Sequence, residues 1–202
     1  MGLAPVWRLR ERRAEAKLGP GWIEIKQAVP ACTACGLHKG RTQTVFGVGD
    51  EAADWMLVGE APGAEEDRLG EPFVGQAGKL LDNMLAAIGL ERGDNVYIAN
   101  VLKCRPPANR NPEPDEVAKC TPFLKRQIAL IQPKLIIAMG RFAAQTLLAS
   151  DATIASLRGR VFSYEGVPLI VTYHPAYLLR NLPDKAKAWA DLVFAKKTMA
   201  TL

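Results

Sequence analysis

The chain contains four cysteines, which fall into two pairs far apart in the sequence. Cys32 and Cys35 form a Cys-x2-Cys motif near the beginning of the chain, whereas Cys104 and Cys120 lie near its middle. The simplest interpretation of thiols arranged in this way is one site at which four thiolates hold a metal centre. A fold that satisfies it must bring the segment around Cys32 against the segments that carry Cys104 and Cys120.

The same cysteines could instead form disulfide bonds or be unrelated buried thiols. The first residues lack the long apolar segment of a secretory signal, and a domain of 202 residues does not need disulfides for its stability. We therefore favour the metal site. Residues 1–20 are rich in basic side chains but also contain Glu11 and Glu15, which favours a solvated basic extension over a transit peptide. We expect this extension to be followed by one domain over residues 21–202.

The composition is that of a globular protein. Hydrophobic residues make up 49% of the chain and charged residues 23%, which is ordinary for a domain with a core. The apolar runs at residues 135–139 and 169–171 have the length of strands, so no membrane span is expected. The net charge of +5 is compatible with a polyanionic partner.

Short apolar runs alternate along the chain with longer amphipathic segments. Such a pattern predicts a parallel sheet that crossover helices cover on both faces. Strands are expected at residues 55–58, 96–102 and 135–139, with one or two more within 161–164 and 168–173. Helices are expected at residues 76–89, 113–131, 142–148 and 186–198.

Polar residues stand at or near the carboxyl ends of three expected strands: residues 59–63, Asn100 within the strand at 96–102, and the pair His174–Pro175. Ligands of open parallel sheets bind beyond the carboxyl ends of the strands. We therefore expect these segments to form one site.

Each polar side chain in these segments has a structural and a functional interpretation. Glu60 lies either in an exposed Gly/Pro turn or in a backbone cradle that faces a ligand. Asn100 is either a structural amide or a group that recognises a paired acceptor and donor, such as the edge of a pyrimidine. His174 either caps or packs locally, or it donates to a developing anion, a role worth about 10²–10³ in rate.

Four further sequence features bear on what the protein binds. Phe73 is either a core aromatic or a stacking platform for a base. His38 follows the Cys-x2-Cys motif and is either an additional ligand or, as we favour, a surface residue. Residues 73–80 lack the glycine and hydroxyl residue of a phosphate-binding loop, which argues against nucleotide hydrolysis. Basic side chains that are either solvated or placed against phosphates are Lys103, Arg105, Arg110, Arg158, Arg160 and Arg180.

Taken together, these residues resemble the family 4 uracil-DNA glycosylases, the iron–sulfur branch of the uracil-DNA glycosylase superfamily. The similarity extends from about Cys32 to Arg180, with its motifs in the expected order. The motifs are Cys-x2-Cys at 32–35, Gly-Glu-Ala-Pro-Gly at 59–63, Glu-Pro-Phe-Val-Gly at 71–75, Asn-Val-Leu-Lys-Cys-Arg-Pro-Pro at 100–107, Cys120, and His-Pro-Ala-Tyr-Leu-Leu-Arg at 174–180.

The resemblance implies an α/β fold, a three-layer α/β/α sandwich around a central, mostly parallel four-stranded sheet. It also implies that a [4Fe–4S] cluster is held by Cys32, Cys35, Cys104 and Cys120. Zinc could occupy the same four thiolates.

The activity implied is that of a monofunctional DNA glycosylase, which flips uracil out of DNA and hydrolyses its N-glycosidic bond to begin base excision repair. The resemblance makes Glu60, Asn100 and His174 the catalytic residues. Phe73 would stack on the base, and the backbone of residues 59–63 (Gly59, Glu60, Ala61, Pro62, Gly63) would surround it.

DNA contacts are expected from the same resemblance. Leu178 would fill the space left by the flipped base, and Arg105, Arg110 and Arg180 would bind the backbone. We expect a monomer in a bacterial cytoplasm whose partner is single- or double-stranded DNA containing uracil. The alternatives are an iron–sulfur nucleic-acid-binding or redox protein without catalytic activity, and a glycosylase for a broader set of damaged bases.

Overall fold

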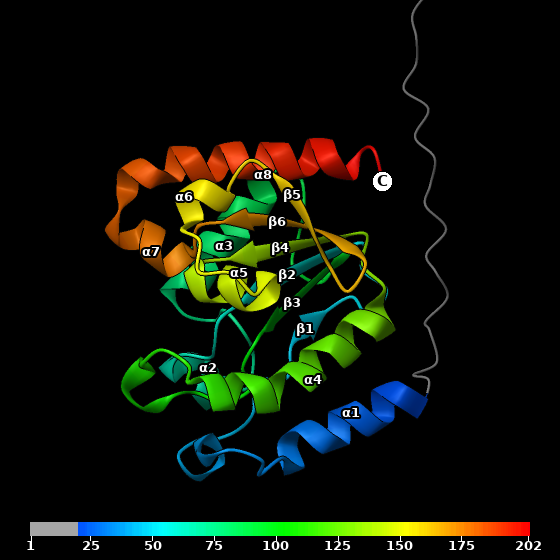
Figure 1. Cartoon of the computed structure of the whole chain (residues 1–202), viewed down its shortest axis with the longest axis vertical. Coiled ribbons are helices and arrows are strands. Elements are labelled where there is room, and N and C mark those ends of the chain that lie inside the picture. Colours follow the sequence, from blue (N-terminus) through cyan, green and yellow to red (C-terminus); the bar gives the residue numbers. More distant parts are fainter. Residues whose placement is uncertain (1–19) are drawn as a thin grey trace, which may run out of the picture.

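The computed structural model of the protein describes residues 20–202. The predicted basic extension therefore lies outside the described residues except for Pro20, which begins the first helix, and the division at residue 20 stays a prediction. Helices and sheet alternate along the described chain (Figure 1). The helices are α1 (Pro20–Ala31), α2 (Ala64–Leu69), α3 (Gln76–Ala87), α4 (Pro114–Ile131), α5 (Arg141–Leu148), α6 (Ile154–Leu157), α7 (Pro175–Arg180) and α8 (Lys185–Met199).

One sheet runs through the described part of the chain, with the strand order β1-β3-β2-β4-β6-β5. Its strands are β1 (Val48–Gly49), β2 (Trp55–Gly59), β3 (Val96–Asn100), β4 (Leu135–Met139), β5 (Val161–Tyr164) and β6 (Val167–Thr172). The four central strands are parallel, whereas β1 and β5 pair antiparallel at the two edges.

The prediction of a three-layer, mostly parallel sandwich is confirmed, but the predicted number of four strands is wrong, because the sheet has six strands within residues 20–202. β1 contributes only two residues to the sheet, too few for a periodic pattern to reveal. β5 returns to β6 through the tight turn Glu165–Gly166, where both residues have positive φ, as a two-residue hairpin requires.

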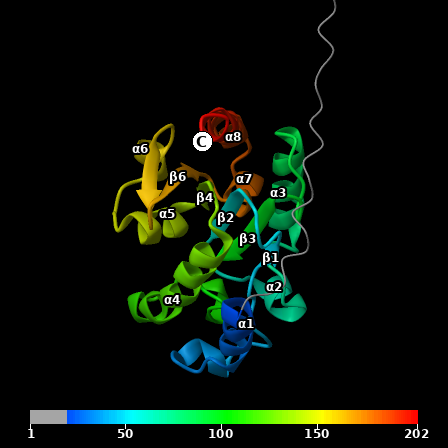
Figure 2. The same cartoon turned by 90° about the vertical axis from the view of Figure 1, so that its right-hand side faces the viewer.

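The alternation of side chains along the strands separates two cores. Ile136 and Ala138 of β4 pack with α1, α4 and α5, whereas Ile137 and Met139 pack with α3, α7 and α8. Figure 2 shows α3 on one side of the sheet and α5 on the other. Both faces of the central strands are therefore buried, which explains why these strands are continuous apolar runs. Within residues 20–202 no helix is long and apolar enough to cross a membrane.

Because the central strands are parallel, their carboxyl ends meet at one edge of the sheet. β2, β3, β4 and β6 end there at Gly59, Asn100, Met139 and Thr172. This edge lies on the left of Figure 1, where α7 follows β6. The fold therefore brings the three polar segments together, as the sequence predicted.

Candidate active site

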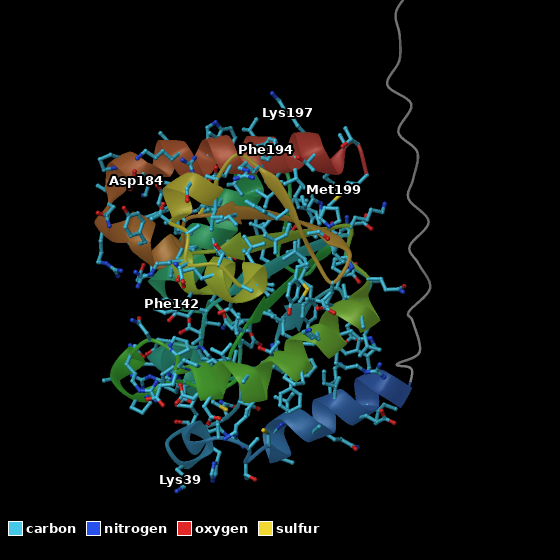
Figure 3. The ribbon with its side chains drawn as sticks, in the orientation of Figure 1. Lys39, Phe142, Asp184, Phe194, Lys197 and Met199 are labelled. Atoms are coloured by element: carbon cyan, nitrogen blue, oxygen red, sulfur yellow. The ribbon has the colours of Figure 1, made fainter. Side chains whose placement is uncertain are left out.

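A cleft of about 730 Å³ lies beyond the carboxyl ends of the central strands. Phe142, which lines it at the beginning of α5, marks its position in Figure 3. The predicted site residues that line the cleft are Glu60, Ala61, Pro62, Gly63, Phe73, Asn100, Arg110, His174 and Arg180. Gly59 lies directly beneath it, because a Cβ atom there would come within 2.4 Å of the Asn100 Oδ1 atom and 2.7 Å of the Phe73 ring.

Asn100 lines the cleft and contains a buried acceptor that has no partner within residues 20–202. Its side chain is 2% exposed, and within the described residues Oδ1 is the buried side-chain polar atom without a hydrogen-bond partner. A buried acceptor left unsatisfied costs about 1–3 kcal/mol, so such groups in native proteins call for a physical reason. A ligand that brings an N–H group to Asn100 would remove this cost.

His174 caps a helix and also lines the cleft. It is the N-cap of α7, and its Nδ1 atom accepts a hydrogen bond from the Ala176 N–H at 3.1 Å. Burial, together with the positive charge of Arg180 and against the opposing effect of Glu66, lowers the pKa of His174 to about 4. The ring is therefore neutral at pH 7. Because Nδ1 accepts, the proton of the neutral ring lies on Nε2, which leaves a donor for the cleft.

Phe73 is held in a conformation that a phenylalanine rarely adopts. Its φ is +56°, a region that costs of order 1–3 kcal/mol unless the surroundings enforce it. Arg92 donates to the carbonyl oxygens of Pro72 and Phe73 at 3.0 and 2.9 Å. The Phe73 side chain is 6% exposed and belongs to the core on the α3 side of the sheet. Its ring lies 5.4 Å from that of His174, with the two planes inclined by 29°.

Glu66 joins the two loops that form the cleft, a role that the sequence analysis missed. One carboxylate oxygen accepts from Gly63 N–H at 3.1 Å, and the other accepts from Val74 N–H at 3.0 Å and Gly75 N–H at 3.2 Å. Its place at the third position of α2, three residues after Gly63, is the acidic position of a capping box. That spacing was the signal available in the sequence.

Glu60 and Arg141 both line the cleft. Burial raises the pKa of Glu60 to about 7, and the positive charge of Arg141 partly opposes the shift. Arg141 follows Gly140, where φ is +89° and a Cβ atom would lie 2.7 Å from the Cβ atom of His174. Only glycine fits this close approach, which places the arginine at the beginning of α5 inside the cleft.

The predicted DNA-binding cations differ in how free they are. Arg180 lines the cleft, is exposed and forms no ion pair within residues 20–202. Arg110 lines the cleft but pairs with Glu116, with nitrogen–oxygen distances of 2.6 and 3.0 Å. Arg105 donates to Asn109 Oδ1 at 2.7 Å and is not among the residues that line the cleft. Lys103, for which a solvated or phosphate-facing position was predicted, is instead 1% exposed.

The prediction that Leu178 acts as a wedge conflicts with its burial. Leu178 is 1% exposed and packs into the core on the α3 side, whereas its neighbour Leu179 is 41% exposed. Residues 175–180 form the helix α7, and successive residues of a helix point in directions about 100° apart. The exposed leucine of this helix is therefore Leu179, which is not among the residues that line the cleft.

All four cysteines line a second, smaller cavity. The Sγ atom of Cys120 accepts from the Lys103 backbone N–H at 3.2 Å, and the Sγ atom of Cys104 accepts from Arg41 at 3.2 Å. No disulfide joins these four residues. Burial raises the pKa of the Cys104 thiol and raises that of Cys120 to about 11.

His38, predicted to be a surface residue, is half-buried at this cavity, and its Nδ1 atom lies 2.7 Å from the Cys35 carbonyl oxygen.

Residues 46–193 match the family model of the uracil DNA glycosylase superfamily, and the chain belongs to this superfamily. It is 51% identical to a type-4 uracil-DNA glycosylase of Archaeoglobus fulgidus, in an alignment that covers 77% of this chain and 82% of that protein. It is 46% identical to the type-4 enzyme of Thermotoga maritima, over 81% and 85% of the two chains. A type-5 uracil-DNA glycosylase of Pyrobaculum aerophilum is 34% identical over 66% of each chain. Within the superfamily, the chain is a member of the type-4 family.

Proposed function

We propose that this protein removes uracil from DNA by hydrolysing the N-glycosidic bond of a nucleotide flipped into the cleft. The unpaired Oδ1 atom of Asn100 is the observation that carries this proposal. Uracil offers an N–H donor next to a carbonyl acceptor, and an asparagine amide offers the matching acceptor and donor. Cytosine has an acceptor where uracil has this N–H group, so its edge would meet Asn100 with two acceptors opposed.

His174 is suited to assist the departure of the base. When the bond between N1 and the sugar breaks, its electron pair leaves with uracil and the sugar gains oxocarbenium character. A neutral Nε2–H donor can bind the oxygen on which negative charge develops, without first giving up its proton. The structure supports this role through the Nδ1 cap, which orients the ring.

Glu60 is the half-buried carboxylate of the loop that follows β2. In its ionised form it can stabilise the positive charge of the sugar and accept a proton from the water that adds to the sugar carbon. Arg141 favours this ionised form. The activity that results is that of a monofunctional glycosylase, which releases uracil and leaves an abasic site.

We also propose that Cys32, Cys35, Cys104 and Cys120 hold a [4Fe–4S] cluster. Their common cavity and the two N–H groups directed at sulfur support this assignment. Within residues 20–202 no group of three or more His, Cys, Asp or Glu side chains is arranged as a metal site, so the assignment depends on the cavity that the four cysteines share. Zinc could occupy the same four thiolates. Bound there, the cluster supplies iron–thiolate bonds that join the end of α1 to the β3–α4 segment.

We also propose a DNA partner, an oligomeric state and a cellular compartment for this enzyme. Its partner is DNA that contains uracil, single- or double-stranded, bound by a monomer. A bacterial cytoplasm, where thiols stay reduced, suits the four cysteines. We further propose that Arg105, Arg110 and Arg180 contact the DNA backbone.

Release of free base from an oligonucleotide with one uracil tests the activity under single-turnover conditions, with a thymine oligonucleotide as control. Protein purified without oxygen should release uracil and no thymine. It should also contain iron and show a broad absorption at about 400 nm. A folded, iron-loaded protein that releases no uracil would contradict the proposed activity. Uracil release by a protein without iron would contradict the proposed cofactor alone.

A further inference from the structure

A buried ammonium group lies between the cysteine cavity and the substrate cleft. Lys103 follows β3 and precedes Cys104, and its side chain is 1% exposed. Its Nζ atom donates to the Asn100 carbonyl oxygen at 2.9 Å and to Gln127 Oε1 at 2.6 Å. Lys103 therefore holds the main chain of the residue whose side chain is proposed to recognise uracil.

The partners of Lys103 are themselves fixed. Gln127 lies on α4, the helix that also carries Cys120. Its Nε2 atom donates to the Phe46 carbonyl oxygen at 2.9 Å and to the Tyr97 hydroxyl oxygen at 3.2 Å. The ammonium is thus connected through hydrogen bonds to α4 and to β3.

These hydrogen bonds do not neutralise Lys103. Its two acceptors are a carbonyl and an amide, and no carboxylate of residues 20–202 forms an ion pair with it. A buried cation is costly unless an opposite charge compensates it. The carbonyl and the amide must therefore hold the ammonium. The Lys103 main chain contacts the four-cysteine site as well, because its N–H donates to the Cys120 Sγ atom at 3.2 Å.

We infer that Lys103 is a positioning residue that couples the four-cysteine site to substrate recognition. One residue is thereby hydrogen-bonded to both sites, because the Lys103 N–H binds the sulfur of Cys120 and its ammonium binds the carbonyl of Asn100. The ammonium in turn fixes the carbonyl of Asn100, and so the direction in which the amide enters the cleft. This inference rests on the proposed function and on the proposed cofactor.

Lys103→Met tests the coupling, because methionine fills similar space without charge or donors. We expect the single-turnover rate at saturating DNA to fall about tenfold to a hundredfold, as for the loss of hydrogen bonds from a charged group. The half-saturating DNA concentration should stay unchanged, and iron should be lost to a chelator faster than from the wild-type protein. A mere loss of stability predicts no such division between rate and binding.

Lys119→Met is the matched control. Lys119 lines the same cavity, but its Nζ atom pairs with Asp115 at 2.7 Å and it makes no contact with Asn100. This variant should keep the wild-type rate and iron retention. Equal effects of the two substitutions would overturn the inference, as would a wild-type rate or wild-type iron retention in Lys103→Met.

Gln127→Met provides an independent test of the role of Lys103 if Lys103→Met does not fold. It removes one acceptor of the Lys103 ammonium and keeps the hydrogen bond to Asn100 that holds the segment before Cys104. Iron retention should therefore be that of the wild type while the rate falls about tenfold. A wild-type rate would overturn the inference. A wild-type protein that releases uracil without binding iron would instead refute the proposed cofactor, and the coupling with it.

Discussion

At the scale of single residues, the cleft contains a carboxylate and an imidazole whose pKa values are shifted in opposite directions. Burial raises the pKa of Glu60 to about 7 and lowers that of His174 to about 4. Burial disfavours the charged form of each group, which accounts for both directions. Between pH 5.5 and 8.5, roughly, only the carboxylate of this pair is expected to change its charge.

The pH dependence of kcat/KM should therefore report Glu60. As the pH rises through about 7, Glu60 loses its proton, so kcat/KM should rise and then level off if the ionised form is the active one. Glu60→Gln should lower the activity and remove this dependence on pH. A Glu60→Gln profile that still rises around pH 7 would assign the titration to another group.

His174 requires a pair of substitutions, because it both caps α7 and faces the cleft. His174→Ala removes both functions, whereas asparagine is a good N-cap and keeps the capping acceptor. If the Nε2–H donor is what matters, both variants should lose about 10²–10³ in single-turnover rate with DNA affinity little changed. Recovery of the rate in His174→Asn would show that the cap, not the donor, is required.

The sequence analysis predicted nine of the 21 residues that line the cleft, mainly because polar segments stand at the ends of apolar strands. It failed for Lys103 and Leu178, and for a common reason. Which side a residue faces in the segment after a strand depends on how that segment folds, and no periodic pattern extends across it. Lys103 turns inward to two acceptors, and Leu178 turns toward α3 because residues 175–180 form a helix.

At the scale of elements, Glu66 connects the loop before α2 to the loop that carries Phe73. Glu66→Gln keeps the size of the side chain but replaces one of its two accepting oxygens by a donor. Because three backbone N–H groups depend on this carboxylate, we expect a loss of about 1–3 kcal/mol in the free energy of unfolding, measured by denaturant titration, together with slower turnover.

Glu65→Gln is the control for this substitution. Glu65 is the adjacent residue of α2, and its carboxylate pairs with Arg68 on the surface. A surface pair of this kind contributes little to stability, so both stability and turnover should remain close to wild type. Equal losses in the two variants would show that Glu66 has no special role in joining the loops.

The elements that the sequence predicted are those with strong periodicity. The central strands β2, β3 and β4 were expected from their apolar runs, and α3 and α4 from their amphipathic pattern. The short elements β1 and α2 were missed, since two to six residues contain too little of any period. Their positions depend on contacts with distant segments, such as the pairing of β1 with β3.

At the scale of the whole molecule, the net charge of +5 and the cations of the cleft suit a polyanionic partner. The cations are not equivalent, however. Arg110 is paired with Glu116, whereas Arg180 is exposed at the cleft and has no ion pair within residues 20–202. A phosphate can bind Arg180 without displacing a carboxylate, so Arg180 should contribute more to DNA binding.

The salt dependence of DNA binding measures this contribution. Each phosphate that a cation neutralises releases counterions, so the slope of log Kd against log salt should become shallower by about 1 in Arg180→Ala. Lys197 lies in the last turn of α8, away from the α7 end of the molecule in Figure 3, and Lys197→Ala changes the net charge equally. If the two substitutions change the slope equally, only total charge matters; if Lys197→Ala leaves it unchanged, DNA approaches the protein at the cleft.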